Sequence, residues 1–195
     1  MFLAAFLVLA ALDWMAVGWH RKRLEYFAKP ATLLALLGYA ALGSGGSTWL
    51  LAALAFSLAG DVFLMLPADL FAAGLAAFLV GHLAYVVAFA TPVGTLLVWL
   101  PVVLVATAPV AIRILRHVHA PGLRTAVAVY MMAIALMAAA AVGSGDVIAI
   151  VGALLFVSSD SLLAWNRFVR PFSSAHLAVM VTYHLGQFGL ATALR

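Results

Sequence analysis

Apolar stretches long enough to cross a lipid bilayer follow one another along the whole of this sequence. Charged side chains make up only 8% of the 195 residues, and most of them fall in short clusters between the apolar stretches. A membrane-spanning helix needs about 20 apolar residues, so the chain has the length for about eight such helices with short loops. The sequence therefore predicts an all-α polytopic membrane protein and leaves no room for a soluble nucleotide-binding domain.

Glycine, proline and charged residues mark the ends of eight predicted spans. The spans cover residues 1–18, 28–42, 48–66, 70–90, 95–114, 122–142, 146–165 and 174–193. The second span is short, opens with Lys29 and Pro30, and ends at the glycine-rich segment 43–46. We expect residues 1–195 to form a single transmembrane helical domain.

The basic residues predict how the chain is oriented in the membrane. With eight spans, all of the ten Lys and Arg residues except Arg195 lie on one side, whereas omitting the second span would divide them equally. Loops on the cytoplasmic side carry an excess of Lys and Arg. The sequence thus predicts eight spans with both termini on the non-cytoplasmic side, in a bacterial inner (plasma) membrane. The basic residues lie in short clusters between spans and form no continuous stripe that would bind nucleic acid.

Short sequence similarities suggest internal symmetry and helix packing faces. The segment Gly60-Asp61-Val62-Phe63-Leu64 is similar to Ser159-Asp160-Ser161-Leu162-Leu163, four predicted helices later, which suggests a weak four-plus-four parallel repeat. Gly81 in the fourth span and Gly186 and Gly189 in the eighth are small enough to let neighbouring helices approach closely.

Three aspartates, Asp13, Asp61 and Asp160, fall inside predicted spans. Placing a charged side chain in the hydrocarbon costs about 2.5 to 3.5 kcal/mol even on insertion scales, so such residues are candidates for function. Asp13 lies in the first span, where we expect it to pair with loop arginines or to reach toward the interface. Asp61 and Asp160 form the better candidate pair, because two carboxyls in an apolar cavity can divide acid and base roles.

Other polar residues share helix faces that could support these carboxylates. Ser57 lies four residues before Asp61, and the pairs His82–Tyr85 and Tyr183–Gln187 are also spaced for one face. His82 is equally well explained as a structural histidine bonded to a neighbouring helix. A zinc site would need a ligand spacing that the sequence lacks, and the chain has no cysteine, so we expect neither a metal nor a cofactor.

Several segments together resemble the YhhN-type lysoplasmalogenase family. They are Lys29-Pro30-Ala31-Thr32, Ser57-Leu58-Ala59-Gly60-Asp61, Phe78 to Tyr85 around His82, Gly152 to Phe156 before Ser159-Asp160, and Tyr183 with Gln187. The resemblance covers nearly the whole chain. It implies an integral membrane enzyme that hydrolyses the vinyl ether of lysoplasmalogens to a fatty aldehyde and glycerophosphoethanolamine or glycerophosphocholine.

That reaction requires proton delivery to carbon and a positioned water, which two carboxyls can supply. We therefore expect Asp61 and Asp160 to be the catalytic pair, without assigning which is the acid. The supporting or substrate-binding candidates are Ser57, His82, Tyr85, Tyr183, Gln187, Lys29 and Asn166. Lys29, Arg167 and Arg170 are placed at the cytoplasmic rim, where they could contact the phosphate of a lysophospholipid.

Two other classes of protein fit the same residues. In a small transporter or lipid-binding protein the carboxylates would carry protons or hold a cationic headgroup. A hydrolase of another lysolipid would share the site and differ only in the bond that it cuts. The expected partners in each case are lysophospholipids and membrane lipids, with no nucleic acid, and the sequence predicts no oligomeric state.

Overall fold

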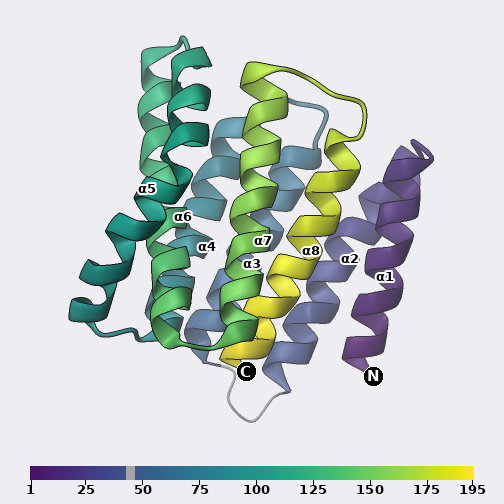
Figure 1. The fold of residues 1–195 in the computed structure, drawn as a ribbon. Coiled ribbons are helices and arrows are strands. Elements are labelled where there is room, and N and C mark those ends of the chain that lie inside the picture. Colours follow the sequence, from purple (N-terminus) through teal and green to yellow (C-terminus); the bar gives the residue numbers. More distant parts are fainter. Residues whose placement is uncertain (43–46) are drawn as a thin grey trace.

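The computed structural model describes residues 1–42 and 47–195, so the predicted glycine-rich connection at 43–46 lies outside the described residues. The chain forms a bundle of α-helices (Figure 1). They are α1 (Phe2–Gly18), α2 (Lys22–Ala41), α3 (Thr48–Met65), α4 (Phe71–Phe89), α5 (Val93–His117), α6 (Pro121–Ser144), α7 (Val147–Ala164) and α8 (Ala175–Leu194), with a π-helix η1 (Trp165–Val169) after α7. The described ranges contain no strand, which confirms the all-α class.

Six helices, α3 to α8, are long and apolar enough to cross a membrane, which supports an integral membrane protein. The apolar helix α1 has 17 residues, and the first turns of α2 carry several charges. The two chain ends lie at the same end of the bundle, as an even number of crossings would require (Figure 1). The count of eight spans and the side on which each terminus lies stay predictions.

Helix α2 begins earlier than the sequence analysis predicted. The expected span starts at residue 28, but the helix starts at Lys22 and contains Pro30 in its interior. A proline within a helix removes one backbone donor, a loss that neighbouring groups in membrane bundles can offset. The Lys29 side chain is buried among the helices, with an exposed fraction of 4%, and its depth in the membrane stays a prediction.

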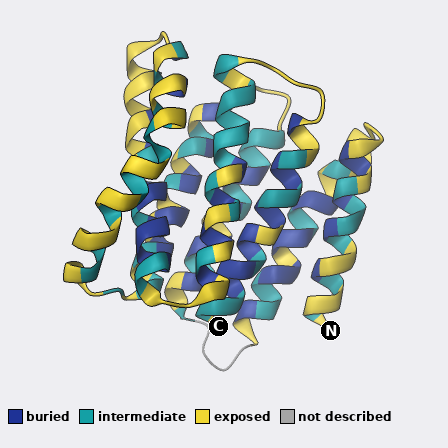
Figure 2. Ribbon diagram, viewed as in Figure 1, coloured by how far each residue is buried: buried dark blue, intermediate teal, exposed yellow. Residues whose placement is uncertain are grey.

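Buried residues gather on the facing sides of the central helices, while α5 is largely exposed (Figure 2). The main apolar cluster draws on α1 to α4 and on α6 to α8. Alanines of α6, including Ala138 and Ala141, contribute to it. Because small side chains let helix backbones approach closely, the cluster packs tightly around the polar residues described below.

Glycines bring α7 and α8 together at backbone distance. A Cβ atom at Gly152 would lie 2.8 Å from the backbone nitrogen of Leu190, and one at Gly186 would lie 2.9 Å from that of Phe156. These contacts confirm the packing face predicted for Gly186 and Gly189. On α4, a Cβ at Gly81 would lie 3.2 Å from the carbonyl oxygen of Ala53 on α3. In each of these two helix pairs, one helix carries a candidate carboxylate: Asp160 on α7 and Asp61 on α3.

Candidate active site

A cavity of about 400 Å³ lies between the helices that carry the two candidate aspartates. Asp61 of α3 and Asp160 of α7 both line it, so the structure brings together the two carboxylates that the sequence singled out. Its other polar lining residues are Lys22, Glu25, Tyr26, Lys29, Ser159, Asn166, His176 and Tyr183. The cavity thus combines two carboxylates with cationic and hydroxyl groups.

Asp61 is held by a chain of hydrogen-bonding side chains from three other helices, α2, α4 and α8. Its Oδ1 lies 3.1 Å from Nζ of Lys29, and the hydroxyl of Tyr183 donates to its Oδ2 at 2.7 Å. Gln187 in turn donates from Nε2 to the Tyr183 hydroxyl at 3.3 Å and accepts from the hydroxyl of Tyr85. All five residues are buried. The network fixes the Asp61 carboxylate with one charged and one neutral donor.

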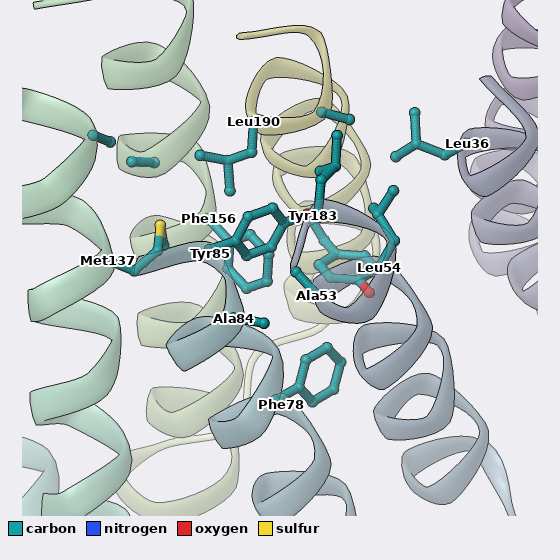
Figure 3. Packing of buried hydrophobic residues seen from close by; sticks show 14 of the residues in the cluster. Leu36, Ala53, Leu54, Phe78, Ala84, Tyr85, Met137, Phe156, Tyr183 and Leu190 are labelled. Carbon is teal, nitrogen blue, oxygen red and sulfur yellow. The ribbon is translucent and has the colours of Figure 1, made fainter. Parts of the chain in front are cut away.

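The aromatic members of this network belong to the main apolar cluster. Tyr85 from α4 and Tyr183 from α8 lie in the same buried group as Phe156 of α7 (Figure 3). The rings of Phe156 and Tyr183 meet edge to face, with centroids 5.4 Å apart. Phe78 meets Tyr183 in the same way at 5.9 Å. Packing against two aromatic neighbours therefore limits where the Tyr183 hydroxyl can point.

Asp160 has a different environment from Asp61. The hydroxyl of Tyr130, on α6, donates to its Oδ2. Within residues 1–42 and 47–195 no Lys, Arg or His side chain forms an ion pair with Asp160. One carboxylate of the cavity is thus paired with a cation and the other with a neutral phenol. This asymmetry is what an acid and base pair requires.

Tyr130 was not among the predicted site residues. It is the single tyrosine of the predicted span 122–142, and a polar tip within so apolar a segment was the available signal. The sequence did not indicate that Asp160 is the partner of this hydroxyl. Asp160 lies 30 residues further along the chain, and nothing in helical spacing says that α6 and α7 turn these two side chains toward each other.

Ser57 and His82 lie outside the cavity. A Cβ at Gly81 would lie 3.3 Å from the hydroxyl oxygen of Ser57, so this serine faces α4, and the hydrogen bonds to Asp61 come from Lys29 and Tyr183 instead. The predicted orientation of Asp61 by Ser57 is not what the structure has.

His82 is a buried residue of the layer behind the cavity. Its Nδ1 lies 2.7 Å from the carbonyl oxygen of Phe78, one turn earlier in α4. Its ring packs edge to face on Phe156 and on Tyr130, with centroids 4.8 and 5.3 Å apart. His82 therefore touches Tyr130, which binds Asp160, and Phe156, which packs on Tyr183.

Asp13 does not pair with a loop arginine or reach the interface. It is fully buried in α1, and neither carboxylate oxygen has a hydrogen-bond partner among the described residues. Helix α1 packs against α2 and α8, which turns this face inward. The neighbouring Trp14 donates from Nε1 to Nδ1 of His184 at 3.1 Å. The sequence-based expectation for Asp13 was therefore wrong.

Two neighbouring residues predicted to contact substrate have different surroundings, because Asn166 lines the cavity and Arg167 does not. Asn166 belongs to the π-helix η1 and accepts a hydrogen bond from the backbone nitrogen of Phe172 at 3.1 Å. Arg167 donates to both carboxylate oxygens of Asp69 at 2.9 and 3.0 Å and lies 4.0 Å from the centroid of the Phe71 ring. Arg167 is thus engaged within the protein, whereas Asn166 faces the cavity.

Glu25 and His176 form a polar contact across the cavity edge, from α2 to α8. Glu25 Oε1 lies 3.0 Å from Nε2 of His176. Burial raises the pKa of Glu25, but the hydrogen bond and positive charge of His176 lower it, and the net pKa lies below the ordinary value for glutamate. In the part of the chain that the structure describes, no three His, Cys, Asp or Glu side chains gather as a metal site.

The fold and the cavity define a polytopic membrane protein with a polar site of paired carboxylates among its helices. Residues 24–194 match the model of the YhhN family, and the chain belongs to this family. Lysoplasmalogenase TMEM86B of Homo sapiens is 40% identical over 149 residues, which cover 74% of this chain and 62% of the human protein. The mouse protein of that name is 34% identical over 174 residues, covering 86% of this chain and 73% of the relative. No solved structure matches this chain.

Proposed function

We propose that this protein hydrolyses the vinyl ether bond of lysoplasmalogens. The observation that carries the proposal is that Asp61 and Asp160 line one cavity in a chain whose relatives are named lysoplasmalogenase. In the reaction, water adds across the alkenyl ether, and the resulting hemiacetal collapses to a fatty aldehyde and glycerophosphoethanolamine or glycerophosphocholine. Every atom of water is retained in the two products, so no redox partner is needed.

Asp160 is the proposed general acid. Its known contact is with a neutral phenol rather than with a cation, so its environment favours the ionised form less than that of Asp61. As the acid, it delivers a proton to the outer carbon of the vinyl ether. The remaining cation is an oxocarbenium, with its positive charge shared between the inner carbon and the ether oxygen. General acid catalysis of this kind contributes about 10²- to 10⁴-fold.

Asp61 is the proposed base and electrostatic partner. Lys29 and Tyr183 both donate to its carboxylate, which favours the ionised form and fixes its orientation. In that form it stabilises the oxocarbenium and takes a proton from the attacking water, which bonds to the inner carbon. Tyr85 and Gln187 support this role by positioning Tyr183, and His82 supports Asp160 through Tyr130.

The headgroup end of the substrate is proposed to lie at the cavity edge. Lys22, Asn166 and His176 line that part and can donate hydrogen bonds to a phosphate. We further propose that the protein resides in a bacterial inner membrane, with eight spans and both ends outside the cytoplasm, because the basic residues would then gather on one side.

The test is release of fatty aldehyde from a 1-alkenyl lysophospholipid by detergent-purified protein. Wild type is compared with Asp61→Asn and Asp160→Asn, and with Asp69→Asn as a matched control, because Asp69 is exposed and lies outside the cavity. We expect each cavity variant to lower kcat/KM at least 100-fold, as loss of acid or base catalysis would. The Asp69 variant should stay within a few-fold of wild type.

Circular dichroism and size-exclusion profiles must be the same for all four proteins, so that a loss of activity is not a loss of fold. A 1-acyl lysophospholipid serves as the second substrate. Release of fatty acid from this lipid without aldehyde from the first would identify a hydrolase of another lysolipid. No product from either lipid with folded wild-type protein would overturn the proposal and favour a transporter or a lipid-binding protein.

A further inference from the structure

A second, apolar pocket lies beside the polar cavity, between α4, α5, α6 and α7. It has a volume of about 70 Å³, and its wall is formed mainly by aliphatic and aromatic side chains. Thr107, Ala111 and Ile114 of α5 line it on one side, and Ala135 of α6 and Val157 of α7 line it on the other. The proposed catalytic roles of the polar cavity do not account for this apolar pocket.

The two spaces adjoin at Asp160. Four residues, Leu64, Phe78, Asp160 and Leu163, line both of them, and Asp160 is the only charged residue of the four. Tyr130, which binds Asp160, faces the apolar side. A molecule that places its reacting bond at Asp160 therefore has a polar space in one direction and an apolar space in the other.

The apolar pocket offers little to a polar ligand. The hydroxyl of Thr107 donates to the carbonyl oxygen of Val103 in its own helix at 2.9 Å, so it is already paired. The other polar lining residues are Tyr130, Asp160 and Ser161, so a polar group placed away from these three would lose its hydrogen bonds to water without gaining equivalent partners. A hydrocarbon chain forms no hydrogen bonds with water, so it loses none in such a site. The shape and polarity of the two spaces match an amphiphile with a charged end and an aliphatic end.

We infer that this pocket binds the hydrocarbon chain of the lysolipid next to its reacting bond, with Asp160 at the junction between chain and headgroup. The inference rests on the proposed function, because the chain is that of the proposed substrate. It adds the chain-binding role of α5, a helix whose outer face is exposed along its length (Figure 2). Since the pocket is small, it holds the first part of the chain, and the rest extends along α5.

The pocket would select among lipid chains by their shape. A lipid chain that enters from a bilayer leaves surroundings as apolar as the pocket, so burial itself gives little preference. A side chain that fills the pocket would therefore act by steric exclusion. Ala111 of α5 is the position to enlarge, because it lines the pocket and is half-buried. Ala106, on the same helix, is exposed and lies outside the pocket, so it is the matched control.

The first experiment detects binding without turnover. A 1-acyl lysophosphatidylcholine with a diazirine in the first part of its chain is photolysed with the full-length protein in detergent, and labelled peptides are mapped by mass spectrometry. We expect labels between Thr107 and Ile114 of α5 and near Ala135 of α6. Ala111→Phe should lower this labelling at least fivefold, and Ala106→Phe should leave it unchanged. Labels spread over the outer face of α5, with no effect of Ala111→Phe, would overturn the inference.

The second experiment measures the chain in catalysis. The ratio of kcat/KM for a hexadecenyl lysophospholipid to that for its ethenyl analogue, which has the vinyl ether but no further chain, is determined for each variant. We expect Ala111→Phe to lower this ratio at least tenfold and Ala106→Phe to preserve it. An unchanged ratio in folded Ala111→Phe protein would overturn the inference. If wild type releases aldehyde from neither lipid, the proposed function fails, and the labelling result alone decides on the pocket.

Discussion

Lys29 and Asp61 form an ion pair of 3.1 Å in which the two side chains are only 5% and 2% exposed. The pair joins α2 to α3 at the polar cavity, so the candidate base is also part of what holds these two helices together. A buried ion pair is costly to form, and losing one member leaves the other charge without compensation. The stability and the chemistry of this site are therefore coupled.

Replacement of Lys29 by methionine is expected to destabilise the protein by about 3 to 5 kcal/mol, because it leaves the buried Asp61 carboxylate without its cation. The double variant Lys29→Met with Asp61→Asn should recover a large part of this loss, since neither charge remains. The free energy of unfolding in detergent, measured for the wild type, both single variants and the double variant, gives the coupling. Losses that simply add would show that the two side chains act independently.

Replacement of Tyr183 by phenylalanine tests whether the hydroxyl, rather than the ring, matters to Asp61. The ring keeps its packing on Phe78 and Phe156, but the carboxylate loses a donor at 2.7 Å. A hydrogen bond to a charged group contributes about 1.5 to 3 kcal/mol, which corresponds to a tenfold to hundredfold lower kcat. Steady-state kinetics should show the loss in kcat with little change in KM.

Tyr39→Phe provides the comparison, because Tyr39 packs against Phe188 and Arg195 outside the polar cavity. Its kcat should equal that of wild type. Equal activity of the Tyr183 and Tyr39 variants would remove Tyr183 from the proposed mechanism.

The positions of the helices could be predicted from the sequence because hydropathy and turn residues act locally. Predicted and observed bounds agree within a few residues for most helices, for example 48–66 against Thr48–Met65. Helix α2 is the exception. Its first turns carry Lys22 and Glu25, and hydropathy treats such a segment as a loop although it continues the helix. The predicted start of this helix was six residues too late for this reason.

The contacts of the site could be predicted only in part. Helical spacing gives the face that Tyr183 and Gln187 share, and the structure joins them by a hydrogen bond of 3.3 Å. Spacing does not give the rotation of one helix against another. The contact between Tyr130 and Asp160 and the inward placement of Asp13 depend on that rotation, so neither could be read from the sequence.

The contact between Glu25 and His176 should make stability depend on pH in the acidic range. The pKa of Glu25 is lower in the folded protein than its ordinary value of 4.5, so folding favours the ionised form. The stabilisation is therefore fully present above pH 4.5 and is lost as the pH falls through the lower folded-state pKa. We expect the Tm of Glu25→Gln to be below that of wild type at pH 6 and to approach it as the pH falls below the folded-state pKa.

The size of this effect should be small, about 1 kcal/mol or less, because the side chain of His176 is 53% exposed. Thermal unfolding of both proteins over this pH range in one detergent measures it. The difference in Tm between the two proteins should shrink as the pH falls. A difference that grows instead would contradict a stabilising contact between ionised Glu25 and His176.

The close approach of α7 and α8 predicts that a single methyl group at Gly152 will be harmful. Its Cβ would lie 2.8 Å from the backbone nitrogen of Leu190, and backbone atoms cannot move aside as a flexible side chain can. Gly152→Ala should cost about 1 to 3 kcal/mol, which outweighs the gain of up to about 1 kcal/mol from better helix propensity. Gly94→Ala, on α5, places its methyl where no atom lies within 4 Å and should leave stability unchanged or slightly higher. Chemical denaturation of both variants measures the difference. Equal stability of the two variants would mean that the helices are not in backbone contact.

The same substitution should also affect activity. Because the added methyl pushes apart the helices that carry Asp160 and Tyr183, Gly152→Ala should also lower kcat.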